Sequence, residues 1–246
     1  VVTDPEGYAV YEGPAAGDTI EIEGIQPWSH AAPVLYHAVL TLRDADGVLQ
    51  EVVPYDIGFR RFEMINGVMC LNGERVVFNG VNRHEWNADR GRAIGADDMH
   101  AAMAVFKKNN INAVRTCHYP DQSLWYDLCD RNGIYMIDET NLESHGSWQK
   151  LGAVEPSWNV PGSLPEWKDC VVDRARSMFE RDKNHAAVLI WSCGNESYAG
   201  EDILAMSQFF HDHDPGRLVH YEGVFHCRAF DAISDMESRM YAKPWE

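Results

Sequence analysis

Residues 111–137 read Ile-Asn-Ala-Val-Arg-Thr-Cys-His-Tyr-Pro-Asp-Gln-Ser-Leu-Trp-Tyr-Asp-Leu-Cys-Asp-Arg-Asn-Gly-Ile-Tyr-Met-Ile, and this stretch decides the fold class. Its two ends, 111–115 and 134–137, are short and apolar, which predicts two buried strands. Between them, the leucines of 121–132 are four residues apart, as on one face of a helix, and Gly133 is typical of a residue that ends a helix. The order strand, helix, strand predicts a βαβ unit with parallel strands.

The same alternation continues on both sides of this unit. Further strands are predicted at 75–81, 187–191, 218–221 and 231–234. Helices are predicted with buried faces formed by Met99, Met103 and Phe106, with Asp97 as cap; by Trp167, Val171, Ala175 and Met178, starting near Pro165; and by Ile203, Met206 and Phe210. About six βα units predict an α/β fold, either a doubly wound sheet or an incomplete (β/α)8 TIM barrel, two strands short of closure.

Residues 1–63 have a different pattern, in which apolar and polar residues alternate. Ile20 and Ile22 alternate with glutamates, and residues 36–42 place every second apolar side chain on one face before an Asp46-Gly47 turn. Half-buried strands of this kind suit an immunoglobulin-like β-sandwich, which needs about 100 residues. The sequence therefore predicts a partial sandwich over 1–63 and a barrel domain over 64–246.

Composition narrows the function classes. The chain has 246 residues, 45% of them hydrophobic, and 21 Lys and Arg against 38 Asp and Glu, giving a formal charge of −17. This charge disfavours nucleic acid and anionic membranes as partners. No apolar run approaches the roughly 20 residues of a membrane span, and no export signal begins the sequence. The six scattered cysteines include no Cys-x-x-Cys pair and predict mostly buried thiols in a reducing cytoplasm.

Polar clusters recur where the predicted strands end. They are Asn82–Glu85, Arg115–Tyr119, Asp138–Glu139, Asn141–His145, Gly194–Glu196, and Glu237 with Tyr241. In a barrel the carboxyl ends of all strands meet on one face, where the catalytic sites of this fold lie. The recurrence therefore favours a catalytic site over a set of unrelated surface residues.

Individual residues of these clusters allow more than one interpretation. His84 and His118 are either packed histidines or hydrogen-bond donors to sugar hydroxyls. Arg115 either orients a catalytic carboxylate or forms a structural ion pair with Asp138 or Glu139.

A second group of residues has the chemistry of a metal site. Glu143, His145 and Glu196 combine two carboxylates with one imidazole, a set that suits Mg2+ or Mn2+ better than zinc, although such groups are often only solvated. Glu143 and His145 are two residues apart on a segment expected to be extended. Glu196 is either a general acid with a raised pKa or a helix-start glutamate that interacts with the helix dipole.

Four stretches of the sequence resemble glycoside hydrolase family 2, of the bacterial β-galactosidase type. They are Phe78–Glu85 (Phe-Asn-Gly-Val-Asn-Arg-His-Glu), Asn112–Pro120, Asp138–Gly146 and Trp191–Ser197 (Trp-Ser-Cys-Gly-Asn-Glu-Ser). The resemblance runs in order from about residue 60 to 242. It implies a TIM-barrel enzyme that hydrolyses terminal β-D-galactose residues with retention, in β-galactosides such as lactose.

The resemblance also implies roles for single residues. Glu196 matches the family's acid/base, and Asn195 matches the neighbouring amide that holds the substrate's 2-hydroxyl. Glu143 and His145, together with Glu196, match its Mg2+ ligands. The sequence motifs Gly-Asn-Glu-Ser and Asn-Leu-Glu-Ser-His-Gly favour a galactosidase over a β-glucuronidase.

Further matches lie at the other strand ends. His84 and His118 match histidines that stabilise the transition state, and Tyr241 matches a tyrosine beside the nucleophile. Arg115 is assigned to substrate binding. The family's nucleophile is a glutamate after strand seven, and neither Glu222, Glu237 nor Glu246 matches its motif, so it is expected beyond the C-terminus and the isolated chain is expected to be inactive.

Two alternatives remain open beside a cytoplasmic β-galactosidase. One is a related β-glucuronidase or β-mannosidase, and a basic pocket that binds an anion would distinguish this alternative. The other is a non-catalytic or complementing fragment, because an open barrel leaves unpaired strand edges that favour association. For the full-length parent, the resemblance implies a homo-oligomer.

Overall fold

The parallel sheet at the centre of the chain has its strands in sequence order. In the computed structural model, which describes residues 1–15, 19–150, 153–243 and 245, this sheet runs β8 (Gly80–Arg83), β9 (Ala113–Thr116), β10 (Tyr135–Glu139), β13 (Val188–Ser192) and β14 (Leu218–His220). Every neighbouring pair is parallel. A doubly wound sheet reverses its strand order at a switch point, whereas a barrel does not. The consecutive order therefore identifies an arc of a (β/α)8 barrel.

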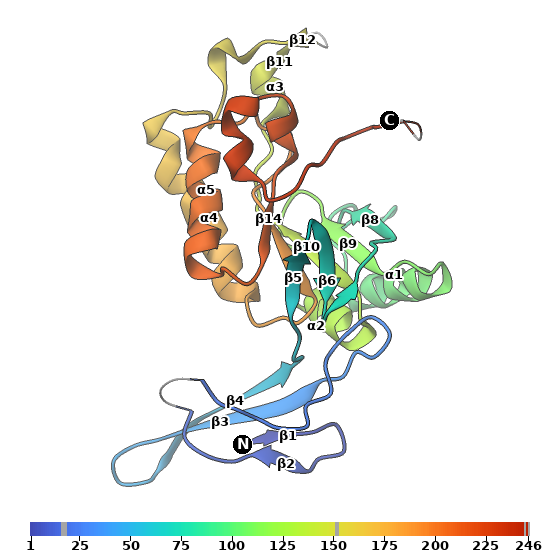
Figure 1. Cartoon of the computed structure of the whole chain (residues 1–246), viewed down its shortest axis with the longest axis vertical. Helices are drawn as coiled ribbons and strands as arrows, with labels where there is room; N and C mark the ends of the chain where they lie inside the picture. Colours follow the sequence, from blue (N-terminus) through green and yellow to red (C-terminus); the bar gives the residue numbers. More distant parts are fainter. Residues whose placement is uncertain (16–18, 151–152, 244, 246) are drawn as a thin grey trace.

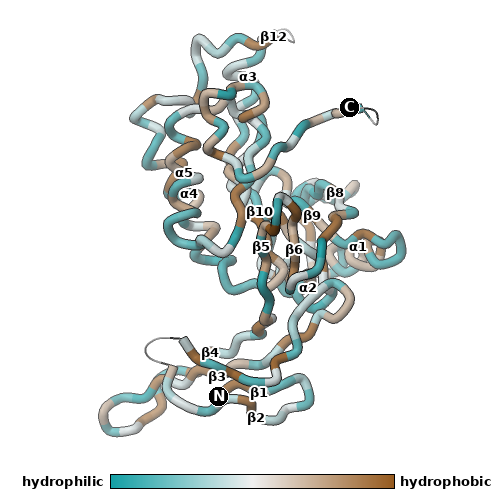
Figure 2. Tube along the Cα trace, in the orientation of Figure 1, coloured by the Kyte–Doolittle hydropathy of each residue, from teal (hydrophilic) through white to brown (hydrophobic). Residues whose placement is uncertain are grey.

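Four long helices connect these strands. They are α1 (Ala96–Lys108), α2 (Ser123–Asn132), α4 (Pro165–Asp182) and α5 (Glu201–His213). Along α4 and α5, hydrophobic and hydrophilic residues alternate, as expected of helices with one buried face (Figure 2). The connection from β10 to β13 is the longest and also carries α3 (His145–Trp148), a short hairpin of β11 (Gln149–Lys150) and β12 (Ala153–Val154), and the 3-10 turn η1 (Pro156–Trp158).

The sequence predicted four of these parallel strands and the long helices to within a few residues. The predicted buried faces of α1 and α5 are confirmed. In α4 Val171, Ala175 and Met178 are buried, but Trp167, which lies in the first turn of the helix, is 39% exposed. Asp97 lies inside the first turn of α1, after the N-cap Gly95.

Two of the predicted strands differ from the structure: one begins at a different residue, and the other is a 3-10 turn. The first barrel strand begins at Gly80 and not at residue 75, because the Asn112 side chain bonds the backbone of Val77 and Asn79 where a neighbouring strand would. Residues 231–234 were predicted as a sixth strand, but they belong largely to the 3-10 turn η3 (Arg228–Ile233). An ion pair between Arg228 and Asp231 favours this turn, and the parallel sheet has five strands in the part of the chain that the structure describes.

The first 57 residues contribute one antiparallel sheet. It contains β1 (Val2–Thr3), β2 (Ala9–Tyr11), β3 (Tyr36–Arg43) and β4 (Leu49–Ile57), with β3 and β4 joined at the predicted Asp46-Gly47 turn. Residues 20–23 were predicted as a strand but lie in irregular structure and a turn. A small three-stranded sheet, β5 (Phe62–Ile65), β6 (Val68–Leu71) and β7 (Glu74–Arg75), follows, beside the parallel sheet in Figure 1.

Trp28 joins the N-terminal segment to the lower end of the parallel sheet. Its side chain is completely buried and its indole N–H donates to the Asp130 carbonyl oxygen at 2.8 Å. Beside it, the Arg60 guanidinium donates to the carbonyl oxygens of Ala186 and Val188, where β13 begins. The N-terminal segment is therefore fixed to the amino ends of the strands, away from their carboxyl ends.

The structure also tests the expectations about the cysteines and about membrane-spanning helices. All six cysteines are free thiols, and four of them are buried, as expected. No helix within the described residues has the length and apolar character to cross a membrane.

Gly133 provides a test of this arrangement. It ends α2 with a φ of 65°, and a β-carbon there would lie 2.8 Å from backbone atoms of His30. Gly133→Ala should lower the free energy of unfolding by about 1–3 kcal/mol, from the left-handed conformation and the clash together. The measurement is urea unfolding. Gly146→Ala is the matched control, because its β-carbon meets nothing within 4 Å; an equal loss in both variants would contradict the account.

Candidate active site

A cavity of about 470 Å3 opens at the carboxyl ends of the parallel strands. Its walls contain most of the residues that the sequence singled out: Asn82, His84, Arg115, His118, Asn195, Glu196 and Tyr241. They come from four different segments of the chain, and the expected convergence of the strand ends is thus confirmed. Glu143 and His145 do not line this cavity but lie next to Glu196.

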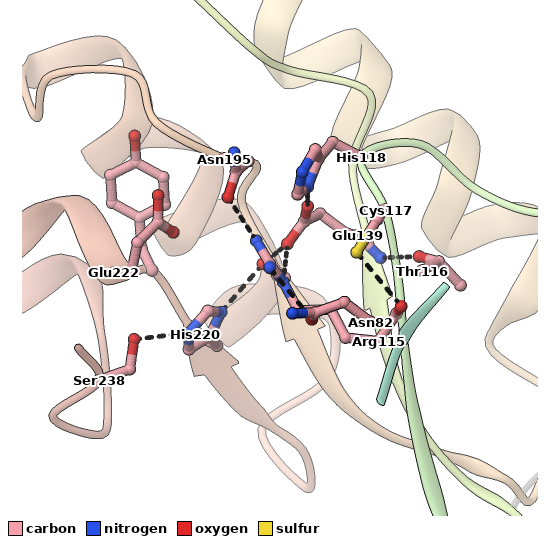
Figure 3. A network of polar contacts seen from close by, with 12 residues as sticks. Asn82, Arg115, Thr116, Cys117, His118, Glu139, Asn195, His220, Glu222 and Ser238 are labelled. Carbon is pink, nitrogen blue, oxygen red and sulfur yellow. Dashed lines mark hydrogen bonds and ion pairs between the residues drawn. The ribbon is translucent and has the colours of Figure 1, made fainter. Parts of the chain in front are cut away.

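The Glu139 carboxylate is the centre of the polar network below this cavity (Figure 3). It is completely buried at the end of β10 and accepts hydrogen bonds from Arg115 Nε at 2.6 Å and Ser192 Oγ at 2.7 Å. Its other oxygen lies 2.6 Å from His118 Nδ1. A buried charge of this kind is stable only when it is paired and fully hydrogen-bonded. The ion-pair interpretation of Arg115 is therefore correct for Glu139.

Arg115 also connects this network to the end of β13. Its Nη2 donates to Asn195 Oδ1 at 2.8 Å, while Asn195 Nδ2 donates to Glu143 Oε2 at 2.5 Å. The amide of Asn195 is thus held on both sides, and its orientation follows from an arginine that cannot lose its proton. No hydrogen bond between Arg115 and the Glu196 side chain occurs among the described residues, so Arg115 acts on the strand end through Asn195.

The two histidines lie side by side with opposite electrostatic environments. The rings of His84 and His118 are 5.3 Å apart and perpendicular. Partial burial lowers the pKa of His118, but its interactions with Cys117 and Glu139 outweigh this effect and raise the pKa to about 9. The pKa of His84 is lowered by burial and by the charge of His118. At neutral pH the pair therefore consists of one cation and one neutral imidazole.

Glu196 follows β13 in a backbone conformation that L-residues rarely adopt. Its φ is 43°, and its backbone N–H donates to Glu222 Oε1 at 2.6 Å. The helix-start interpretation is wrong, because α5 begins only at Glu201. Glu222 is buried, and its other oxygen has no hydrogen-bond partner among the described residues. Burial, opposed by the Glu196 N–H and by Arg115 but reinforced by Glu139, raises the pKa of Glu222 to about 7.

The candidate metal ligands come together as the sequence predicted. One donor atom each from Glu143, His145 and Glu196 lies within 4.8 Å of the others. His145 Nδ1 forms an ion pair with Glu196 Oε2. The segment between Glu143 and His145 is not extended as expected, since His145 already begins α3. The three side chains are nevertheless on the same side of the β13 end.

Tyr241 and the remaining glutamates are less closely involved. Tyr241 lines the cavity, but 91% of its surface is exposed. Glu237 is exposed and paired with Arg228 and Arg239, and Glu246 lies outside the described residues.

The sequence did not single out several residues that complete the site. Ser192 bonds Glu139, and His220 Nδ1 lies 3.0 Å from Ser192 Oγ, while His220 Nε2 contacts Ser238. Burial lowers the pKa of His220 to about 3, with a contribution from Arg115, so this ring is neutral. Ser192 and His220 are each the last residue of their strand, and that position was the available signal. Glu222, two residues after β14 ends, was noted only as a poor match to the nucleophile.

The comparisons with known proteins agree with the fold. Residues 62–245 match the TIM barrel domain of the glycosyl hydrolases family 2, and residues 3–60 match a further model of glycosyl hydrolases family 2. The chain therefore belongs to glycoside hydrolase family 2.

Curated relatives of high identity cover most of this chain. A β-galactosidase of Halalkalibacterium halodurans is 65% identical over 88% of the chain and 21% of its own length. A β-galactosidase of Streptococcus thermophilus is 57% identical over 99% of the chain and 24% of its own length. A β-galactosidase large subunit of Lactobacillus acidophilus is 56% identical over 92% and 36%. The chain thus spans about a fifth to a third of the length of these relatives.

Solved structures share the fold at low identity. A β-glucuronidase from Ruminococcus gnavus in complex with D-glucuronic acid has a TM-score of 0.81 at 23% identity, covering 96% of this chain and 40% of that one. A second complex of a Ruminococcus gnavus β-glucuronidase, with a C6-substituted uronic isofagomine, has a TM-score of 0.77 at 24% identity, covering 89% and 37%. The TM-scores support the barrel architecture, whereas sequence identities this low say nothing of the substrate.

The Glu139 network generates a titration prediction. Glu139→Gln removes one of the two partners that raise the His118 pKa, while Cys117 remains, so this pKa should fall below about 9. The measurement is an NMR titration of the histidine ring signals. His185, whose pKa is raised by Asp130, is the internal control and should not change. An unaltered His118 titration would contradict the assigned pairing.

Proposed function

We propose that the protein of which this chain forms part is a retaining β-galactosidase that hydrolyses terminal β-D-galactose residues in β-galactosides such as lactose. The observation that carries the proposal is the cavity at the strand ends, where Asn195, Glu196 and two histidines converge. The names of the three curated relatives support galactose as the sugar. In this proposal residues 64–246 supply most of the catalytic barrel, and residues 1–63 are part of a supporting sandwich.

Glu196 is the proposed acid/base. Glu196 lines the cavity, and its backbone N–H donates to Glu222. In a retaining hydrolysis the Glu196 carboxyl group donates a proton to the oxygen of the leaving alcohol and later removes one from water. Asn195 and Arg115 are the proposed binding groups for the sugar hydroxyls, since their donors and acceptors are already oriented by each other. Such preorganisation reduces the entropy lost on binding.

His84, His118 and Tyr241 are proposed to act on the transition state. An oxocarbenium-like transition state strengthens hydrogen bonds made to the sugar hydroxyls. His118 is a charged donor, because its contact with the Glu139 carboxylate stabilises the protonated ring. Charge-assisted hydrogen bonds are roughly twice as strong as neutral ones. Tyr241 lines the same cavity from the C-terminal segment and is the proposed partner of the nucleophile.

The attacking carboxylate is proposed to come from another part of the protein. Retaining enzymes have their two carboxyl groups about 5 Å apart. Glu139 is occupied by Arg115, His118 and Ser192, and Glu222 by the Glu196 backbone. Glu237 is held by two arginines. These carboxylates already have other partners, so we expect residues 1–246 alone to be inactive.

A magnesium ion is the proposed cofactor, with manganese as an alternative. Glu143, His145 and Glu196 fit this ion in kind, since two carboxylates and one imidazole suit a hard divalent cation with water as its further ligands. Two oxygens bound to one Mg2+ lie at most about 4.2 Å apart, so the observed set within 4.8 Å needs only a small contraction. When bound, the ion would supply positive charge beside the acid/base.

Two alternatives are less well supported. A β-glucuronidase would need a free cation for the uronate carboxylate, but Arg115 is paired with Glu139 and Arg239 with Glu237. A complementing subunit gains some support from the relatives named large subunits, and a homo-oligomeric parent remains a proposal. The six free thiols favour a cytoplasmic location.

The activity proposal is tested in a chimera. Residues 1–246 replace the matching segment of the Streptococcus thermophilus β-galactosidase, to which they are 57% identical. The chimera should hydrolyse a chromogenic β-galactoside and not the corresponding β-glucuronide. Glu196→Gln should lower kcat by roughly 10²- to 10⁴-fold, as expected for loss of a general acid. Glu201→Gln, an exposed control on α5, should leave kcat unchanged. A folded chimera that cleaves only the glucuronide would refute the proposal.

The metal proposal is tested on the chain itself. Adding Mg2+ at about 100 times its dissociation constant should stabilise the fold by about 2.7 kcal/mol, and a chelator should reverse the shift in Tm. Glu143→Gln should remove this shift. Glu51→Gln, an exposed control on β4, should keep it. An identical shift in both variants would place the binding elsewhere.

A further inference from the structure

His220, the last residue of β14, lies between the Glu139 network and the C-terminal segment of the chain (Figure 3). The residue is buried. Its Nδ1 lies 3.0 Å from Ser192 Oγ, and its Nε2 lies 2.9 Å from Ser238 Oγ. Ser192 Oγ is in turn 2.7 Å from Glu139 Oε2. Both ring nitrogens therefore have a hydroxyl partner, and the two hydroxyl groups belong to distant parts of the sequence.

The donors and acceptors of these groups fix the direction of the hydrogen bonds. A carboxylate only accepts, so the single proton of the Ser192 hydroxyl is donated to Glu139. Ser192 Oγ must then accept from His220, which requires the ring proton to be on Nδ1. The ring is neutral, because burial and the charge of Arg115 lower its pKa, and Nε2 is thus an acceptor. The hydroxyl of Ser238 therefore donates to Nε2.

The segment that donates this hydrogen bond forms part of the cavity wall. Ser238 and the three residues after it line the cavity of about 470 Å3. Residues 234–243 have irregular structure, and Tyr241 has a φ of 57°. A residue with a side chain keeps such a left-handed conformation only where the surrounding contacts hold it. The position of Tyr241 therefore depends on how the preceding residues are attached.

The contacts that attach this segment differ in their exposure. Asp235, at its start, accepts from the Val219 N–H of β14. Glu237 pairs with two arginines, but all three side chains are about half exposed, and exposed ion pairs contribute little. The Ser238 hydroxyl instead contacts the buried ring of His220 at a strand end. A hydrogen bond in such a place is electrostatically stronger than one in water.

We propose that His220 is a positioning residue, which joins residues 238–241 to the buried carboxylate of Glu139 through this one-directional chain of hydrogen bonds. The charge that holds Arg115 at one wall of the cavity then also fixes the C-terminal segment at the opposite end of the network. The effect on catalysis rests on the proposed function, in which Tyr241 acts beside the nucleophile. The chain of hydrogen bonds itself does not depend on that function.

The first experiment determines the tautomer of His220 in residues 1–246 at neutral pH. Correlated 1H and 15N NMR signals of the ring distinguish a proton on Nδ1 from one on Nε2, and the His220 signals are those missing from His220→Gln. The neutral ring with its proton on Nδ1 is expected, because Ser192 needs a donor there. A neutral ring with its proton on Nε2 would reverse the chain and overturn the proposal.

The second experiment measures the attachment of the segment as the rate of trypsin cleavage after Arg239 in residues 1–246. Ser238→Ala and His220→Leu should each raise this rate about 2- to 10-fold, because loss of an ordinary hydrogen bond makes local opening more frequent by that factor. His220→Gln, whose amide both donates and accepts, should stay within about twofold of the original rate. Ser177→Ala, exposed on α4, is the matched control. Equal rates in Ser238→Ala and this control would overturn the proposal.

The third experiment uses the chimera with the Streptococcus thermophilus β-galactosidase. Ser238→Ala should lower kcat on a chromogenic β-galactoside by about 2- to 10-fold and change KM by less than about twofold, because Tyr241 is proposed to act on the transition state. His220→Gln should keep kcat within about threefold, whereas His220→Leu should not. Unchanged kcat in both Ser238→Ala and His220→Leu would overturn the positioning role. An inactive chimera, with the expected tautomer and cleavage rates, would confirm the attachment and contradict the proposed β-galactosidase activity instead.

Discussion

The buried charge of Glu139 is the constraint on which the arrangement of the site depends. A carboxylate without exposure to solvent costs several kcal/mol unless every lone pair is satisfied, and here a guanidinium, an imidazole and a hydroxyl satisfy it. These partners come from β9, from the segment that follows β9, and from β13. Glu139 itself ends β10, so one charge fixes the relative positions of three strand ends. Removing any one partner would leave an uncompensated charge, and this penalty keeps Arg115 and His118 in place.

A second set of contacts fixes the backbone of the proposed acid/base. Glu196 has a left-handed backbone conformation, which costs about 1–2 kcal/mol for a residue with a side chain. The segment after β14 compensates for this cost: Glu222 accepts from the Glu196 N–H, and Tyr221 donates to the Ser197 carbonyl oxygen. A β-carbon on Gly223 would lie 2.9 Å from the same carbonyl, so only glycine allows this close approach. The positions of Glu196 and its neighbours thus depend on β14 as much as on β13.

The sequence predicted those features that local patterns determine. Helix faces and Gly133 follow from spacing and backbone conformation, and the polar strand ends follow from the strand positions. The predictions failed where a distant contact decides the structure. Asn112 replaces the first part of β8, and residues 231–234 turn because Ile233 packs inward while Arg228 and Asp231 pair. Residues 20–23 alternate like a strand, but no neighbouring strand pairs with them within the described residues.

The site shows the same limit for side chains. Arg115 had two possible acidic partners in sequence, Asp138 and Glu139, which are adjacent and therefore point to opposite sides of β10. Asp138 accepts instead from the Tyr126 hydroxyl of α2, on the helix side of the sheet, so only Glu139 faces the strand ends of the site. Choosing between Asp138 and Glu139 requires the register of β10 against β9, in which Ile137 pairs with Arg115. The sequence of neither strand alone determines this register.

The contacts that stabilise the barrel and the residues proposed for catalysis lie at opposite ends of its strands. Trp28 and Arg60 contact the amino ends of the strands, as does the Asp130 carboxylate, which accepts from the Ala187 N–H. The cavity of about 470 Å3 lies at the opposite ends of the strands. Barrels of this kind generally place stabilising contacts on the amino face and catalytic loops on the carboxyl face. The N-terminal sheet contributes to the same end of the barrel, since Asp56 of β4 pairs with Arg131 in the last turn of α2. Among the described residues these contacts brace the barrel at the end opposite Glu196.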